Sequence, residues 1–193
     1  MSKILFATRN PGKMREAREI LSNCELLSPA DVPVLKNIDP AETGSTFKEN
    51  AELKARAYGQ ASQLPVIAED AGLEVLSLNN QPGVQSARFF MGTDQDRYLK
   101  VLELLAGQIN RQARYTAVIC WYDPASDQTK FFSGTVDGQI ALEPKGTGGF
   151  GYDPIFIPEG HHQTFGELDA AIKHQLSHRK KALSAFYDWW QAR

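Results

Sequence analysis

Several features are scarce in this sequence, and each scarcity excludes a class of protein. The chain has 193 residues and 2 cysteines, Cys24 and Cys120, which lack the spacing of a metal-binding motif. Both lie in apolar stretches, so we expect reduced, buried thiols rather than a disulfide. No apolar run approaches the length of a membrane-spanning helix, and the run Ile4 to Thr8 is too short for a secretion signal. We therefore expect a cytoplasmic protein with no membrane contact.

Positive charge is not in excess either. The 21 lysines and arginines are balanced by 23 aspartates and glutamates, for a formal net charge of −2. This balance disfavours a protein that tracks a nucleic-acid backbone, but it leaves a small anionic ligand possible. Hydrophobic residues make up 42% and charged residues 23%, which is ordinary for a globular protein. A chain of this length buries a core without disulfides or metals.

Hydrophobic periodicity predicts alternating strands and helices. The expected strands are Ile4 to Thr8, Pro65 to Ala68, Leu73 to Leu76, Tyr115 to Tyr122, Thr129 to Val136 and Ile155 to Ile157. Five helices are expected. The first follows Asn10, the second follows a capping box at Thr46 and Glu49, and the third spans Thr93 to Leu105. The fourth begins near Thr164 at a second capping box with Glu167, and the fifth begins at Ser177. The pattern indicates a single α/β domain, residues 1–193, with a mixed twisted sheet and flanking helices.

The loop after the first expected strand is a candidate phosphate site. It reads Thr8-Arg9-Asn10-Pro11-Gly12-Lys13, with Asn10 placed to cap a helix and Pro11 at its first position. Backbone N–H groups at a helix start attract anions, and Arg9 and Lys13 add positive charge beside them. The spacing differs from a Walker A loop, which disfavours a P-loop ATPase. A solvated loop with incidental charges is the alternative.

Glu69 and Asp70 are the sharpest chemical signal in the chain. They close an expected buried strand, and carboxylates at the carboxyl end of such a strand usually face a ligand crevice. Adjacent anions favour a nearby cation, and Mg²⁺ prefers a few carboxylates together with substrate phosphates. Glu42 is a candidate for an additional carboxylate. The alternative is an acidic turn leading into Ala71-Gly72.

Asn50 and Lys54 are four residues apart and so share one face of the helix expected there. A polar group and a cation on one face suit a phosphate site, although such pairs are more often solvated.

The Gly-rich stretch 146–151 matches the G-x-G-x-x-G pattern. A strand follows it where the dinucleotide fingerprint needs a helix, so a Rossmann site is rejected. As a flexible loop, it is expected to bring Phe150, Tyr152 and Asp153 to a surface, where rings stack on a base and a carboxylate accepts hydrogen bonds. The alternative is a tight bend with Phe150 in the core.

Basic residues open the last expected helix, at the end that disfavours cations. The segment reads Ser177-His178-Arg179, and a local rule broken without visible compensation indicates function. His178 and Arg179 are therefore expected to meet hydrogen-bond acceptors on a ligand, and Lys173 is placed to reach the same pocket. The structural alternative is that Arg179 pairs with a nearby carboxylate such as Glu167 or Asp169.

Taken together, these segments resemble the inosine/xanthosine triphosphate pyrophosphatase family. Segments 7–13, 47–56, 68–73, 146–156 and 177–179 occur in the family's order and span nearly the whole chain. The run Gly-Thr-Gly-Gly-Phe-Gly-Tyr-Asp-Pro-Ile-Phe, paired with Ser-His-Arg, carries the resemblance most specifically. It implies an ITPase-like fold of two lobes around a central cleft, a homodimer, and Mg²⁺-dependent hydrolysis of ITP, dITP and XTP to the monophosphate and pyrophosphate, which clears deaminated purines from the nucleotide pool.

The resemblance also implies a role for each candidate residue. Asp70 matches the proton acceptor, and the implied metal ligands are Glu42, Glu69 and Asp70. The implied phosphate contacts are Thr8, Arg9, Asn10, Pro11, Gly12, Lys13 and Lys54. The implied contacts to the base and neighbouring groups are Phe150, Gly151, Tyr152, Asp153, Lys173, His178 and Arg179, and Ala71 is a further substrate contact.

Two positions depart from the family's pattern. Arg9 stands where many relatives have a small residue, and Ala71 stands where a substrate-contacting serine is common. Only the backbone of Ala71 can therefore hydrogen-bond to substrate. Two other functions stay open: a pyrophosphatase for other modified nucleotides, such as pyrimidines, and a non-catalytic nucleotide- or RNA-binding module, which would not need Glu69 and Asp70 together.

Overall fold

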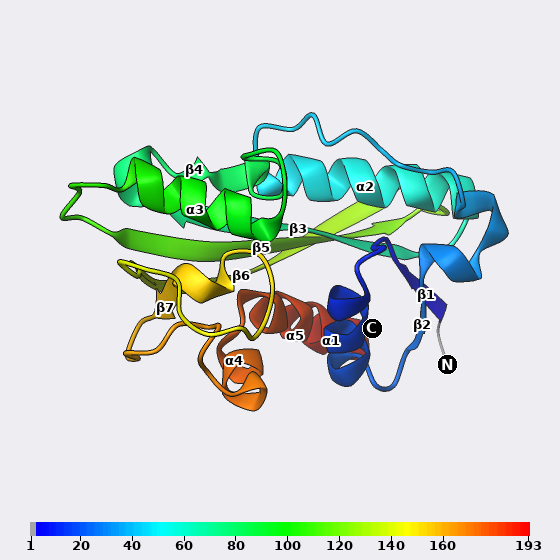
Figure 1. Cartoon of the computed structure of the whole chain (residues 1–193). Coiled ribbons are helices and arrows are strands. Elements are labelled where there is room, and N and C mark those ends of the chain that lie inside the picture. The colour runs from blue at the N-terminus through cyan, green and yellow to red at the C-terminus, as the bar shows by residue number, and fades with distance from the viewer. Residues whose placement is uncertain (1–2) are drawn as a thin grey trace. The chain divides into compact units, whose positions relative to one another are not determined.

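The computed structural model describes residues 3–193, which form a mixed seven-stranded sheet with flanking helices (Figure 1). The strands are β1 (Lys3–Phe6), β2 (Glu25–Leu27), β3 (Val66–Val75), β4 (Gln81–Pro82), β5 (Gln112–Asp123), β6 (Gln128–Ile140) and β7 (Phe156–Pro158). The α-helices are α1 (Pro11–Ile20), α2 (Phe47–Ser62), α3 (Asp94–Leu104), α4 (Ala170–Leu176) and α5 (His178–Gln191). The predicted α/β class is confirmed.

Parallel and antiparallel pairs both occur in the sheet, whose strand order is β2-β1-β3-β5-β6-β7 with β4 paired to β3. Strand β1 runs parallel to β2, with Leu5 opposite Leu27, and parallel to β3, with Leu5 opposite Val66. The pairs β3–β4 and β6–β7 are antiparallel. The sheet is therefore mixed, as the sequence predicts.

The chain divides into two compact units. Unit 1 takes the chain up to Asp70 together with Ala117–Gly134 and Arg179–Arg193, and unit 2 takes Ala71–Thr116 and Thr135–His178. Each has its own core: Leu5, Val66, Ala55 and Tyr58 belong to the core of unit 1, whereas Leu73, Val101, Phe156 and Phe165 belong to that of unit 2. Within unit 1, α2 covers one face of the sheet, and α1 and α5 lie side by side on the other (Figure 1).

One strand replaces two expected ones. The segments Pro65 to Ala68 and Leu73 to Leu76 are predicted as separate strands with an acidic end between them, but β3 runs without a break from Val66 to Val75. Glu69 and Asp70 therefore lie in mid-strand, and the prediction that they close a strand is wrong. Small residues such as Ala71-Gly72 suit a turn locally, but pairing with neighbouring strands overrides that preference.

The helix-start signals are largely confirmed. Asn10 caps α1 with Pro11 at its first position, Thr46 caps α2, and Thr93 caps α3. The expected helix at Thr164 is wrong: Thr164 and Glu167 exchange the hydrogen bonds of a capping box, but α4 begins at Ala170 with Asp169 as its cap. These hydrogen bonds therefore stabilise a turn that precedes α4.

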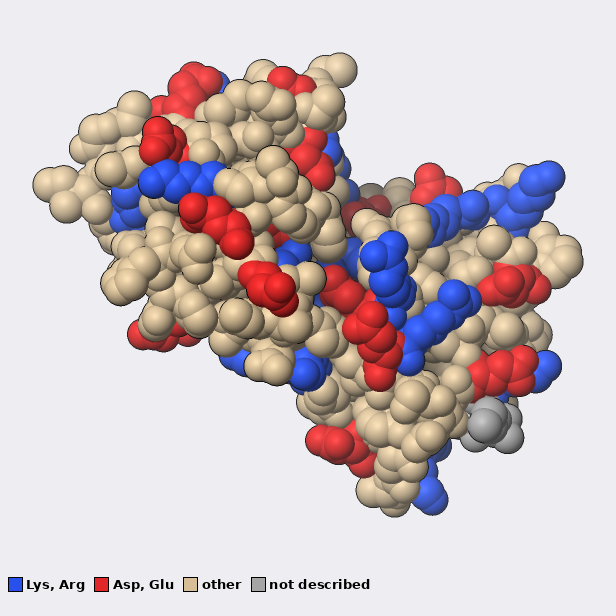
Figure 2. Space-filling model, turned by 60° about the horizontal axis from the view of Figure 1, so that its bottom comes forward, with Lys and Arg blue, Asp and Glu red and all other residues tan. Residues whose placement is uncertain are grey.

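The structure bears on the expected absence of a membrane-spanning helix and on the expected state of the cysteines. No helix within 3–193 is long and apolar enough to cross a membrane. Both cysteines are free thiols, but Cys24 is half-buried and only Cys120 is fully buried. Burial raises the pKa of the Cys120 thiol to about 12. On the face shown in Figure 2, basic and acidic side chains are interspersed rather than gathered by sign.

Candidate active site

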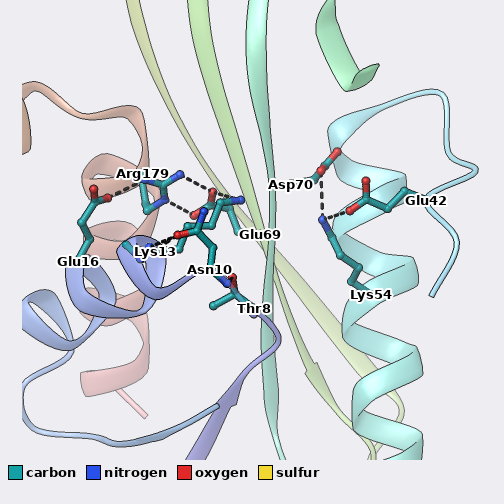
Figure 3. A network of polar contacts seen from close by, with 10 residues as sticks. Thr8, Asn10, Lys13, Glu16, Glu42, Lys54, Glu69, Asp70 and Arg179 are labelled. Carbon is teal, nitrogen blue, oxygen red and sulfur yellow. Dashed lines mark hydrogen bonds and ion pairs between the residues drawn. The ribbon is translucent and has the colours of Figure 1, made fainter. Parts of the chain in front are cut away.

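The candidate site in unit 1 is built around β3, whose side chains alternate between the two faces of the sheet. Glu69 and Asp70 are adjacent and therefore project to opposite faces, each into its own set of polar partners (Figure 3). The two carboxylates are buried, with exposed fractions of 3% for Glu69 and 7% for Asp70. The sequence predicts one acidic cluster here, and the structure places two.

Asp70 faces α2 and meets residues from two other segments. The ammonium of Lys54 lies 3.1 Å from Asp70 Oδ1 and 2.6 Å from Glu42 Oε1, so one cation bridges both carboxylates (Figure 3). The second oxygen of Asp70 accepts a hydrogen bond of 3.2 Å from the Asn50 amide. Asn50 and Lys54 share one face of α2, as their spacing predicts. Glu42, Asp70 and Lys54 form the Asp70 cluster.

Burial and charge shift the titration of this cluster. Burial raises the pKa of the Asp70 carboxyl, and nearby Glu42 adds to the rise, although the Lys54 ammonium opposes it. Burial alone would lower the pKa of Lys54, but Asp70 and Glu42 outweigh it and hold the pKa of Lys54 above its ordinary value. A carboxyl with a raised pKa is a better proton acceptor near neutral pH than an ordinary one.

The donor set of the Asp70 cluster fits a magnesium ion that arrives with phosphates. The described residues contain no group of three or more His, Cys, Asp or Glu side chains arranged around a common point. Two carboxylates, Glu42 and Asp70, do converge on one cation, the Lys54 ammonium. Mg²⁺ is commonly held by one or two carboxylates, with waters and substrate phosphates completing the shell.

Glu69 belongs to a different cluster on the opposite face. Arg179, the second residue of α5, contacts it with two nitrogens: Nε lies 2.7 Å from Oε2 and Nη2 lies 3.0 Å from Oε1. Lys13 Nζ lies 3.1 Å from Glu69 Oε1, and Arg179 Nη1 lies 2.7 Å from Glu16 Oε2 (Figure 3). Glu69, Arg179, Lys13 and Glu16 form the Glu69 cluster.

The Glu69 cluster changes two expectations. Glu69 is not brought together with Glu42 and Asp70, so of the three expected metal ligands only the latter two share a cation. Arg179 pairs with Glu69 and Glu16 rather than with Glu167 or Asp169. These partners compensate the unfavourable place of a cation at a helix start, since two carboxylates outweigh the positive end of the helix. A role for Arg179 in binding the base stays a prediction.

The expected phosphate loop adopts its predicted form, but its donors are partly engaged. Asn10 Oδ1 accepts from the backbone N–H groups of Gly12 at 2.8 Å and Lys13 at 3.1 Å, and Pro11 has no N–H. The Asn10 cap therefore satisfies the backbone N–H groups at these two positions within the chain. Thr8 Oγ1 accepts from the backbone N–H of Asn10 at 3.2 Å.

The side chain of Arg9 points away from the rest of this loop. Its Nη2 donates to the backbone carbonyls of Leu35, Lys36 and Ile38 over 2.9 to 3.1 Å. These contacts attach the segment that precedes Glu42 to the end of β1. The phosphate role expected for Arg9 stays a prediction.

Unit 2 holds the residues expected to bind the base, except Arg179, which belongs to unit 1. Lys173 Nζ lies 2.6 Å from Asp153 Oδ2 and 5.0 Å from the centre of the Phe150 ring. Phe150 is 40% exposed, so the alternative that places it in the core is wrong. Its backbone N–H donates to Asp153 Oδ2 at 2.7 Å, and the backbone N–H of Gly151 donates to Asp94.

Not every aromatic residue of the Gly-rich loop reaches a surface. Tyr152 is 4% exposed, packs in the core of unit 2, and donates its hydroxyl to the backbone carbonyl of Ser86 at 2.8 Å. Asp153 is buried as well, so the predicted surface position of these two residues is wrong. His178 stacks on the Tyr115 ring with centroids 4.7 Å apart, and Ala71 is half-buried on β3.

Sequence reasoning missed two residues of these arrangements, Glu16 and Tyr115, and it missed the partner of a third, Asn50. Glu16 lies on α1, one turn after Gly12, and nothing local links it to Arg179. Tyr115 is expected only as part of a strand, yet it supports His178. Asn50 is noted on a helix face, but its contact with Asp70 joins segments 20 residues apart. Long-range contacts of this kind leave no periodic signal in one sequence.

Comparisons with known proteins agree with this architecture. A family model described as the Ham1 family matches residues 4–189. A dITP/XTP pyrophosphatase from Aquifex aeolicus is 41% identical over 94% of this chain and 93% of its own length. One from Thermococcus kodakarensis is 40% identical over 97% of this chain and 96% of its own.

Solved structures match equally well. A HAM1 protein from Coxiella burnetii has a TM-score of 0.93 at 38% identity and covers 100% of both chains. The Ham1 protein of Staphylococcus aureus has a TM-score of 0.91 at 36% identity and covers 99% of both chains. With a family model that covers nearly the whole chain and relatives of this similarity, the chain belongs to the Ham1 family.

Proposed function

We propose that this chain hydrolyses the triphosphates of deaminated purines, dITP, ITP and XTP, to the nucleoside monophosphate and pyrophosphate. The observation that carries the proposal is the Asp70 cluster, in which the carboxylates of Glu42 and Asp70 converge on the Lys54 ammonium. Carboxylates that already share one cation suit a metal ion and the phosphates that it would bind. Relatives about 40% identical to this chain are named dITP/XTP pyrophosphatases, which supports the same substrate class.

Glu42 and Asp70 are the residues that would hold Mg²⁺. When bound, the ion would neutralise phosphate charge and lower the pKa of a water molecule. Asp70 would accept a proton from the attacking water, a role that its raised pKa supports. Lys54 and Lys13 would contact phosphate oxygens as point charges.

Base selection is proposed for residues of unit 2. Phe150 offers an exposed ring, and Lys173 offers an ammonium beside it. Ammonium groups only donate hydrogen bonds, which suits the 6-keto oxygen of hypoxanthine and xanthine and disfavours the 6-amino group of adenine.

Steady-state kinetics across a nucleotide panel test this function. With Mg²⁺ and pyrophosphate detection, kcat/KM for dITP and XTP is expected to exceed that for ATP by about a hundredfold or more. The reason is that adenine would leave the Lys173 ammonium without an acceptor, and such a loss of pairing discriminates strongly. A preference for dTTP would assign the chain to pyrimidine nucleotides instead. Absence of pyrophosphate release with every nucleotide would leave only a binding module.

We also propose a cytoplasmic site of action, because nucleoside triphosphates are kept there, and assembly as a homodimer. Neither nucleic acid nor a membrane is a proposed partner. The formal net charge of −2 supports the first of these two exclusions.

A further inference from the structure

Asn50 is a buried polar side chain whose two ends reach different parts of the Asp70 cluster. It is 0% exposed, on a helix face that otherwise buries Phe47, Ala51, Ala55 and Tyr58. A buried amide destabilises a fold unless its polar atoms are hydrogen-bonded. The partners of this amide are therefore the reason that the position tolerates a polar residue.

One end of Asn50 holds the loop that carries Glu42. Asn50 Oδ1 accepts a hydrogen bond of 2.8 Å from the backbone N–H of Gly44, which lies two residues after Glu42. A Cβ atom at position 44 would lie 2.7 Å from Asn50 Oδ1 and 2.7 Å from Glu49 Cβ. Only glycine allows the backbone to approach this closely, so the contact depends on both residues.

The other end of Asn50 holds the second carboxylate. Because the Gly44 N–H is a donor, it must face Oδ1, and Nδ2 is then directed to Asp70 Oδ2 at 3.2 Å. Lys54, one turn later on α2, contacts the other oxygen of Asp70 at 3.1 Å and Glu42 at 2.6 Å. Two adjacent turns of one helix thus hold both acids.

The two helix residues differ in what they do when phosphates arrive. Lys54 is a cation that phosphate oxygens attract, so its contacts with Glu42 and Asp70 compete with substrate. Asn50 is neutral, and its two hydrogen bonds need not change. We propose that Asn50 is a positioning residue that keeps Glu42 and Asp70 in register for a divalent cation, independently of Lys54. This inference rests on the proposed function of the Asp70 cluster.

The test compares Asn50→Ala with a control, Glu49→Gln, in the full chain. Glu49 precedes Asn50 on α2 and accepts hydrogen bonds from Ser45, outside the Asp70 cluster. The affinity for Mn²⁺ alone is measured by titration calorimetry without nucleotide, and kcat and KM are measured with the best nucleotide substrate. Asn50→Ala is expected to weaken Mn²⁺ binding and lower kcat by about tenfold each, with KM changed less than about threefold, because phosphate contacts remain.

Glu49→Gln is expected to keep Mn²⁺ affinity and kcat within about twofold, since only an exposed contact at the helix start is altered. Gly44→Ala disturbs the same contact from the loop and serves if Asn50→Ala does not fold, with the same expected losses. Folded variants that retain both Mn²⁺ affinity and kcat would overturn the positioning role. The Mn²⁺ titration keeps its meaning even if dITP proves not to be a substrate, so failure of the proposed function is distinguishable.

Discussion

Replacing Asp70 by asparagine is expected to lower kcat by about a hundredfold or more, because the change removes both a proton acceptor and one of two carboxylates for the metal. The replacement is nearly isosteric, and Lys54 keeps its contact with Glu42 at 2.6 Å. The fold should therefore persist. The measurement is steady-state pyrophosphate release at saturating Mg²⁺, with circular dichroism to compare folding.

Glu74→Gln is a matched control for Asp70→Asn. Glu74 lies on the same strand, and its carboxylate accepts a hydrogen bond from Thr116 instead of belonging to the Asp70 cluster. We expect its kcat to stay within about twofold of the wild type. If Asp70→Asn keeps more than a tenth of the wild-type kcat, Asp70 is neither the base nor an essential ligand.

Arg179→Ala is expected to lower the free energy of unfolding by about 3–5 kcal/mol, because it leaves Glu69 as a buried charge without its main partner. The side chains of Arg179 and Glu69 are 4% and 1% exposed. Burial opposes the charge on Arg179, but Glu69 and then Glu16 raise its pKa above the ordinary value, so the guanidinium stays charged at every working pH. Denaturant unfolding monitored by tryptophan fluorescence measures the loss.

An exposed ion pair provides the comparison for Arg179. Lys3 and Glu25 are paired at 3.3 Å, with side chains 59% and 45% exposed, so Lys3→Ala should cost about 1 kcal/mol or less. A double variant, Arg179→Met with Glu69→Leu, should recover much of the lost stability because it removes both charges of the buried pair.

Arg179→Ala also decides between a structural role and a role in base selection for Arg179. If Arg179 mainly balances Glu69, the ratio of kcat/KM for ITP to that for ATP stays unchanged in the folded Arg179→Ala protein. A lower ratio with unchanged stability would instead assign Arg179 to the base and contradict the ion-pair account.

Local signals in the sequence predict local structure well. Asn10-Pro11 predicts the start of α1, and Thr93 predicts the start of α3, because a cap and its helix lie within a few residues. Asn50 and Lys54 share a face of α2 as expected, since helical spacing alone determines that placement. These predictions needed no knowledge of the fold.

Long-range pairing explains what the sequence could not predict. The break expected after Asp70 is absent because β3 continues through sheet pairing, which depends on strands distant in the chain. The partner of Arg179 is 110 residues away, so a search among neighbouring carboxylates could not find it. Alternation along an unbroken strand then separates Glu69 from Asp70, so Glu69 lies outside the Asp70 cluster, and its role as a metal ligand stays a prediction.

The products formed from dITP test the central claim most directly, which is that the Asp70 cluster supports cleavage to a monophosphate and pyrophosphate. Phosphorus NMR of the purified chain with dITP and Mg²⁺ is predicted to show dIMP and pyrophosphate appearing in equal amounts, and neither product should appear at a comparable rate with Asp70→Asn. Formation of dIDP and orthophosphate, or equal rates for the wild type and Asp70→Asn, would contradict it.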